Sequence, residues 1–294
     1  MKNYKLSDET KTLPWGLVLH RVVATTTFTL ACGVTINAGD VGGWIEKASN
    51  LSDNAWVWGN ARVYDNAQVS GNAEVCDNAE VSGDAKVSGD ALVFGDARVS
   101  GDAQIYDDAQ VYGNAKVFGN AKVCSDAQVR GNAQVYDDTK IYGDAEVSGD
   151  ARVYGNANVS DNALIYGNAE VSGDARVCDN AQVSGYAQVY DRAQIYGNTE
   201  VFGDAKVSDY AEVFGNAKVY GDAEVMNNGD YIVFKNSWSS GRYFTWTKSN
   251  DMWLVGCFYG TGDELIKKAY ADSEDIGKHY EACVKLVEPL KNVE

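Results

Sequence analysis

The sequence predicts an all-β solenoid, in which short parallel strands stack in triangular coils between two small terminal regions. Three observations predict this fold. The chain reads in six-residue units without insertion from Asp53 to Met226, which makes 29 hexapeptides. The fifth position is Val or Ile in every unit, and the third is Ala in 27 of them. The first position is mostly Gly or Asp and the second mostly Asn or Asp, which are residues of tight turns.

Each hexapeptide accounts for one strand and one corner. Ala and Val stand two positions apart, so they point to the same side of a short strand and form the core, while the fourth and sixth positions point outward. Gly accepts left-handed backbone angles at the corner, and Asn or Asp side chains bond to nearby backbone there. Three units close a coil of 18 residues. Nearly ten coils, stacked about 4.8 Å apart, predict a prism on the order of 46 Å long.

The two ends have ordinary composition and are expected to cap the open solenoid. The expected regions are an N-terminal cap over 1–52, a hexapeptide β-helix over 53–226 and a C-terminal α+β domain over 227–294. Strands are expected over 17–24, 27–32, 231–235, 242–248 and 252–259. A helical region is expected over 263–286, beginning at a capping box formed by Thr261 and Glu264 and split or bent at Gly277.

The repeat resembles a known family. The order aliphatic-x-x-x-small-x, as in Val-Ser-Gly-Asp-Ala-Lys over 81–86, is the hexapeptide pattern of left-handed parallel β-helices of the LpxA-like superfamily. A right-handed solenoid, with longer and less regular coils, is the structural alternative. The segments 19–24, 38–46 and 50–57 resemble the start of YdcK-type hexapeptide-repeat proteins, and 253–261 resembles the small domain that often follows their repeats. Bacteria, prophages and phages encode such proteins, often labelled transferases by fold analogy.

The charge distribution limits the classes of molecule that the chain is expected to bind. The chain has 25 Lys+Arg and 42 Asp+Glu, a net charge of −17, which argues against a long nucleic acid as partner. Of the 28 acids in the repeat, 21 stand at the corners, whereas the fourth positions carry ten Lys or Arg against seven Glu. The strand faces are therefore mildly basic, which is compatible with a small anionic ligand. No apolar run reaches the roughly 18 residues of a membrane span, so a cytoplasmic protein without membrane contact is expected.

Catalysis finds little support in the residues. Hexapeptide acyltransferases typically use a His as general base together with loops that interrupt the repeat. Here the only histidines, His20 and His279, lie outside an uninterrupted repeat. Cys76, Cys124 and Cys178 occupy outward sixth positions and are expected to be free thiols. We therefore expect no catalytic residue, no cofactor and no metal site.

One candidate ligand surface is a ladder of aromatic and cationic residues on three consecutive coils. Flat rings beside cations can hold a base, a nucleotide or a sugar. General support of the sheet is the alternative role, because aromatic residues favour strands. The candidate residues are Lys116, Phe118, Tyr136, Arg152 and Tyr154.

A second candidate surface comes from departures from the repeat pattern. Arg192 and Tyr210 replace the usual Asn or Asp and stand 18 residues apart, so they are expected to stack at one corner. Arg130 is the only charged sixth-position residue. An Arg beside a Tyr can receive an anion, and docking of the C-terminal domain is the alternative. The tryptophans of the terminal regions are expected first to cap the open core, and an aromatic recognition surface around Trp238, Arg242 and Trp246 is the alternative.

These observations favour a non-catalytic binding or scaffold protein. The resemblance to phage-encoded proteins suggests an accessory factor that binds or sequesters a host protein or a small, nucleotide-like anion. An acyl- or other group transferase is one alternative, and an acidic rod that mimics DNA is another. Related β-helix enzymes are often trimers, but the mixed outward rows name no interface, so a homo-oligomer, either a trimer or a dimer, is left open.

Overall fold

The computed structural model describes residues 3–291 and divides into two compact units, residues 1–167 and 168–294, which we call unit 1 and unit 2. Both units carry coils of a parallel β-solenoid, about ten in all, and this confirms the predicted fold class.

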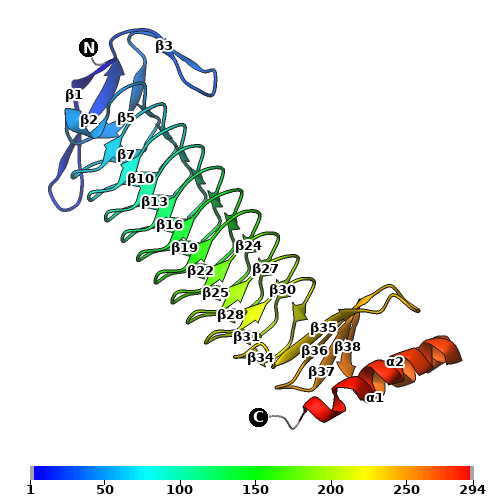
Figure 1. Ribbon diagram of the computed structural model, residues 1–294. Helices are drawn as coiled ribbons and strands as arrows, with labels where there is room; N and C mark the ends of the chain where they lie inside the picture. Colours follow the sequence, from blue (N-terminus) through cyan, green and yellow to red (C-terminus); the bar gives the residue numbers. More distant parts are fainter. Residues whose placement is uncertain (1–2, 292–294) are drawn as a thin grey trace. The chain divides into compact units, whose positions relative to one another are not determined.

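Unit 1 begins with an antiparallel sheet that leads into the coils. Its strands pair in the order β1 (Tyr4–Thr12), β2 (Val18–Ala24) and β5 (Val41–Ile45). β5 then pairs in parallel with β7 (Arg62–Val63), so the last strand of the cap also starts one face of the solenoid (Figure 1). Between β2 and β5 lies the hairpin of β3 (Phe28–Thr29) and β4 (Thr35–Ile36), and the 3-10 turn η1 (Ala48–Asn50) follows β5. The strand expected over 27–32 is thus shorter, because the chain turns at Gly33, whose amide donates to the carbonyl of Leu30.

The coils of unit 1 consist of two-residue strands that alternate among three faces. Each strand pairs in parallel with the strands one coil before and after it. The first face holds β7, β10 (Glu80–Val81), β13 (Arg98–Val99), β16 (Lys116–Val117), β19 (Gln134–Val135) and β22 (Arg152–Val153). The second holds β8 (Gln68–Val69), β11 (Lys86–Val87), β14 (Gln104–Ile105), β17 (Lys122–Val123), β20 (Lys140–Ile141) and β23 (Asn158–Val159). The third holds β6 (Trp56–Val57), β9 (Glu74–Val75), β12 (Leu92–Val93), β15 (Gln110–Val111), β18 (Gln128–Val129), β21 (Glu146–Val147) and β24 (Leu164–Ile165).

The interior of these coils is built from the third and fifth positions. From Ala61 to Ile165 the side chains at these positions are 0 % exposed. Thr139 is the one polar member of this set in unit 1, and its hydroxyl donates to the carbonyl of Tyr136 at 2.6 Å. A Thr can therefore replace Ala here because its polar atom keeps a partner inside the coil.

The corners depend on a left-handed residue at the first position. Gly131 has φ +70°, and a Cβ there would lie 3.0 Å from the backbone nitrogen of Gly149 in the next coil. Asp77 adopts φ 61° as well, and its carboxylate accepts the amide of Gly95 at 3.1 Å. The same bond recurs at several Asp corners, so the Asp side chain offsets the cost of its backbone conformation.

Substitution of Asp77 tests this explanation of the corners. Asp77→Ala removes the bond to Gly95 and leaves a Cβ in the left-handed region, so we expect a loss of about 1–2 kcal/mol in unfolding free energy. Asp77→Asn retains an acceptor and tolerates this conformation, so it is expected to cost less than about 0.5 kcal/mol. Urea denaturation measures both, and equal stability of the two variants would contradict the explanation.

The N-terminal cap supplies hydrogen-bond donors to the carbonyls of the first coils. The buried side-chain amide of Asn50 donates to the carbonyls of Asp65 and Ala67, at 3.1 and 2.8 Å. The guanidinium of Arg21 donates to the carbonyl of Gly59 at 2.7 Å. In the body of unit 1, the carbonyls of each coil accept hydrogen bonds from backbone amides of the preceding coil. At the N-terminal end, the side chains of Asn50 and Arg21 donate to carbonyls of the first coil in the same way.

Unit 2 carries further coils of the same kind and then a compact α+β region. Its coil strands are β25 (Glu170–Val171), β26 (Arg176–Val177), β27 (Gln182–Val183), β28 (Gln188–Val189), β29 (Gln194–Ile195), β30 (Glu200–Val201), β31 (Lys206–Val207), β32 (Glu212–Val213), β33 (Lys218–Val219) and β34 (Glu224–Val225). An antiparallel sheet follows, with β35 (Tyr231–Lys235), β36 (Tyr243–Thr247), β37 (Met252–Val255) and β38 (Phe258–Thr261) in sequential order. The helices are α1 (Gly262–Asp272), α2 (Glu274–Val287) and the 3-10 turn η2 (Glu288–Leu290).

Two expectations for this region are wrong in detail. The single strand expected over 252–259 is a hairpin, because Gly256 adopts φ +61° and reverses the chain between β37 and β38. The capping box of Thr261 and Glu264 is confirmed, but the helices separate at Ser273, whose hydroxyl caps α2 by accepting the amide of Ile276. Gly277 lies inside α2, where a Cβ would stand 2.3 Å from the ring of Tyr270.

Candidate functional site

The predicted aromatic ladder forms on the first face of unit 1. The rings of Phe118 and Tyr136 lie 4.8 Å apart with an interplanar angle of 3°, and those of Tyr136 and Tyr154 lie 5.0 Å apart at 1°. Lys116 and Arg152 stand on the strands β16 and β22 of the same face, so all five predicted residues share one surface. However, the stacked rings cover one another. A flat ligand therefore cannot insert between them, and their edges are what a ligand would meet.

Cations on the first face are only partly neutralised. Arg62 forms an ion pair with Glu80 on the next coil, with 2.8 Å between Nη2 and Oε2. Further along the row, Arg98 lies directly opposite Lys116 on neighbouring strands, and both side chains are exposed. Within residues 3–291 neither of these two forms a salt bridge. Glu80 lies in register on the other side of Arg98, but its ion pair is with Arg62. Like charges in register destabilise a sheet, so Arg98 and Lys116 leave a positive patch beside Phe118.

The predicted corner pair in unit 2 is in contact. Arg192 donates from Nη1 to the hydroxyl of Tyr210 at 2.9 Å and lies 5.4 Å from its ring centroid. Its Nε also lies 3.7 Å from a carboxylate oxygen of Asp174. Tyr210 remains 68 % exposed, so the C-terminal region does not cover this corner and docking does not explain it. Because two neighbours already engage the guanidinium, Arg192 is a weaker anion receptor than the sequence suggests.

Arg130 stands apart from the other predicted residues of unit 1. It follows β18 on the third face, whereas the aromatic ladder is on the first. Its guanidinium forms an ion pair with Glu146 on the next coil. The charge of Arg130 is thus compensated locally, which favours a structural role.

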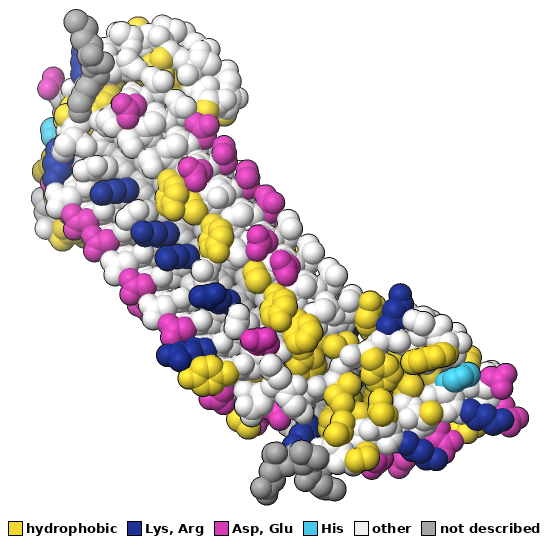
Figure 2. All heavy atoms as spheres, in the orientation of Figure 1, with side chains coloured by type: hydrophobic (Ala, Val, Ile, Leu, Met, Phe, Trp, Pro, Cys, Tyr) yellow, Lys and Arg dark blue, Asp and Glu magenta, His cyan; other side chains and the backbone are white. Residues whose placement is uncertain are grey.

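Sequence reasoning missed a second row of cations. Lys122 and Lys140 lie opposite each other on the second face of unit 1, beside Tyr142. Figure 2 shows the other row, on the first face, whose strands face the viewer in Figure 1: basic side chains follow a line there beside hydrophobic ones, and acidic side chains gather along the edges. The signal was readable from the sequence, because the two lysines are 18 residues apart at fourth positions.

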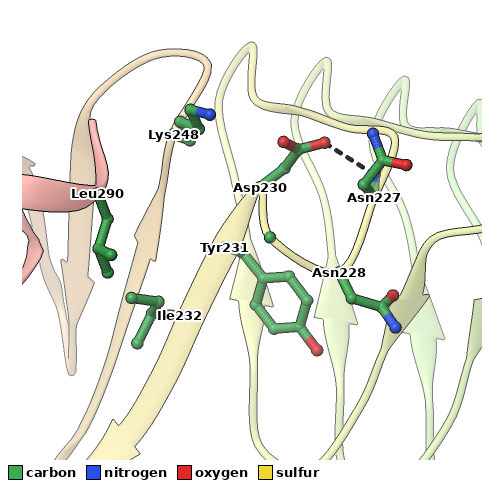
Figure 3. Close-up of a pocket in the computed structure, with 8 residues that line it drawn as sticks. Asn227, Asn228, Asp230, Tyr231, Ile232, Lys248 and Leu290 are labelled. Carbon is green, nitrogen blue, oxygen red and sulfur yellow. Dashed lines mark hydrogen bonds between the residues drawn. The ribbon is translucent and has the colours of Figure 1, made fainter. Parts of the chain in front are cut away.

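Unit 2 contains a hollow of about 390 Å³ that is lined by the turn after its last coil, the start of β35, Lys248 and Leu290 of η2 (Figure 3). The carboxylate of Asp230 accepts the backbone amides of Met226 and Asn227 there, both at 2.8 Å, and so fixes the turn that forms one wall. The lining residues are Asn227, Asn228, Gly229, Asp230, Tyr231, Ile232, Lys248 and Leu290. Asn228, Asp230 and Tyr231 use their polar atoms in hydrogen bonds to backbone groups of the turn and of the last coils.

The aromatic surface suggested for the C-terminal region holds only in part. Trp246 is fully buried in the core between the sheet and the helices, so it cannot contact a partner. Trp238 is 73 % exposed in the loop between β35 and β36, where the buried Asn236 accepts its amide at 3.2 Å. Arg242 lies at the other end of this loop.

The histidines and cysteines show no catalytic arrangement within residues 3–291. His20 lies in β2 with Nδ1 3.3 Å from the carbonyl of Ser7, and His279 lies in α2 with Nδ1 2.7 Å from the carbonyl of Asp275. None of the six cysteines, all within the described residues, forms a disulfide. Burial raises the pKa of Cys76 to about 12, so this thiol stays protonated at neutral pH and is a poor nucleophile.

Neither a comparison with models of protein families nor one with curated proteins finds a match to this chain. None of the helices among residues 3–291 is both long and apolar enough to cross a bilayer. By its fold, the chain is a parallel β-solenoid protein with additional elements before and after the coils.

Proposed function

We propose that this chain is a non-catalytic binding protein, a left-handed β-helix of the YdcK type from a phage or prophage, whose faces bind a small anionic ligand. The observation that carries the proposal is the patch on the first face of unit 1. Arg98 and Lys116 face each other in register, and neither forms an ion pair among the described residues; Glu80, on the other side of Arg98, is paired with Arg62. Phe118 at the end of the aromatic ladder lies beside them.

The repulsion between Arg98 and Lys116 favours a binding role for this patch over a purely structural one. Elsewhere the same cross-strand positions hold opposite charges, as in Lys206 and Glu224, whose side chains meet at 2.9 Å. A solenoid under no other constraint gains from such pairs and loses from like ones. Two facing cations cost stability, and an anion bound between them would offset that cost.

Calorimetric titration of the full chain with nucleotides, sugar phosphates and pyrophosphate tests the proposal. Binding of at least one of these anions is expected, with an affinity that falls as salt concentration rises. Lys116→Gln is expected to weaken this binding by about tenfold, the equivalent of about 1.4 kcal/mol. Gln is well tolerated at this position, since Gln134 follows in the same row.

The matched control is Lys206→Gln, because Lys206 is already paired with Glu224. It should leave the affinity unchanged. If the wild-type chain binds none of these anions, the proposal falls. A host protein captured from lysate by the wild-type chain, and equally by Lys116→Gln, would place the function on another surface.

A further inference from the structure

We propose that the second face of unit 1 binds a small ligand of the nucleotide class, which carries a phosphate group and a planar base. Lys122 and Lys140 hold its phosphate, and the ring of Tyr142 stacks on its planar part. This inference goes beyond the proposed function, because it assigns a second anion site on a different face of the solenoid and names the ligand class of that site.

The two lysines present an electrostatic problem that a phosphate resolves. They lie directly opposite each other on the neighbouring strands β17 and β20. Strands are about 4.8 Å apart, so one phosphate group can accept hydrogen bonds from both ammonium groups. Neither lysine side chain has a hydrogen bond or ion pair within the described part of the chain. Bound phosphate would therefore turn a repulsive pair into two attractive contacts.

The surroundings of the pair select a small ligand. No Asp or Glu stands at the fourth or sixth position of the six hexapeptides that form this face in unit 1. Acids begin at the corners on either side. Asp138 precedes Lys140 and accepts the side-chain amide of Asn120 at 2.9 Å, and Asp144 follows Tyr142 at the other corner. A long polyanion would overlap these acidic edges, whereas a single nucleotide fits between them.

Tyr142 differs from the tyrosines of the aromatic ladder. It is 38 % exposed, and its ring has no aromatic partner among residues 3–291. The sixth-position neighbours on the coils before and after are Cys124 and Ser160, both small. A planar ligand can thus take the place that the next ring occupies in the ladder of Phe118 and Tyr136.

The spacing of the two elements suits one molecule. Lys140 in β20 and Tyr142, the residue directly after this strand, flank the buried Ile141, so their Cα atoms are about 6.6 Å apart. This places a cation and a ring side by side. A phosphate linked to a base through a sugar can reach both.

Calorimetric titration of the full chain with AMP, adenosine and inorganic phosphate tests the site. AMP is expected to bind more tightly than either fragment. Lys122→Gln and Lys140→Gln should each weaken AMP binding by about tenfold. Tyr142→Ser should weaken AMP and leave inorganic phosphate unchanged. Ser is tolerated at this outward position, since Ser88 occupies it on the same face.

Two control variants separate the site from general charge effects. Lys86→Gln removes a lysine of the same face whose cross-strand neighbours are Gln68 and Gln104. Tyr166→Ser removes a tyrosine of similar exposure, 40 %, that follows Leu164 and Ile165 on the third face. Neither control should change AMP binding.

The outcomes distinguish this inference from the proposed function. If AMP binds to the wild-type chain and binds equally well to the double variant Lys122→Gln/Lys140→Gln, the second face is not the site, while anion binding elsewhere stands. The assignment to these two lysines is also overturned if Lys86→Gln weakens binding as much as Lys122→Gln. If no anion binds to the wild-type chain, both proposals fail.

Discussion

Removal of residues 227–294 is expected to convert the chain from a defined species into large aggregates. The last coil of unit 2 has amides with no further coil to receive them. Side chains of the C-terminal region accept these amides instead: Thr245 Oγ1 accepts from Lys218 at 3.0 Å, and Ser249 Oγ accepts from Glu224 at 2.7 Å. The truncated chain would expose a row of free N–H donors above an apolar core, which is a template for strand addition.

Other acceptors of this cap come from the turn after the last coil and from β35. Asn228 accepts the amide of Glu212 at 2.7 Å, and the hydroxyl of Tyr231 accepts that of Phe214 at 3.3 Å. Light scattering after size exclusion compares the truncated and full chains directly. A truncated chain with the same dispersity and melting temperature as the full chain would show that these bonds do not protect the end.

A substitution of Tyr231 in the full-length chain tests the same cap without a truncation. Its hydroxyl also donates to the carbonyl of Glu212 at 3.0 Å, and burial raises its pKa to about 12. Folding favours the neutral phenol, so this contribution to stability is complete below about pH 10 and is lost as pH rises toward 12. Tyr231→Phe should cost about 1–3 kcal/mol near neutral pH. The difference from wild type should shrink above pH 10, as followed by denaturation at each pH.

The sequence was sufficient for the solenoid because every hexapeptide repeats the same pattern. Alternation of Ala and Val specifies an inside and an outside, and the turn residues specify the corners, so no long-range information is needed. The ends lack such redundancy. The hairpin at Gly256 and the helix break at Ser273 depend on packing between the C-terminal sheet and its helices, which composition alone does not reveal.

The candidate site shows the same division. A spacing of 18 residues correctly placed Lys116 in one row with Arg152, and Arg192 beside Tyr210. It could not show that Asp174 also engages Arg192, or that the ladder rings cover one another, because side-chain orientation is set by neighbours on adjacent coils. Rows can thus be read from the period, but the partners within them cannot.

A charge placed at one inward position should unfold a large part of unit 1, whereas the same charge one residue earlier should have little effect. Val117 is fully buried between Val99 and Val135 of the neighbouring coils. Val117→Asp buries a carboxylate without a partner and is expected to cost about 4 kcal/mol or more. Lys116→Asp points outward beside Arg98, so it should change stability by no more than about 0.5 kcal/mol.

The size control is Val117→Ile, because Ile105 and Ile141 occupy fifth positions on the second face and the interior already accepts that side chain. It should cost less than about 1.5 kcal/mol. In a solenoid each coil is stabilised mainly by its neighbours, so the defect of Val117→Asp weakens the coils on both sides of it. Urea denaturation followed by circular dichroism should therefore show a lower midpoint and a less cooperative transition. Equal losses for Val117→Asp and Lys116→Asp would mean that alternation along the strand does not separate core from surface.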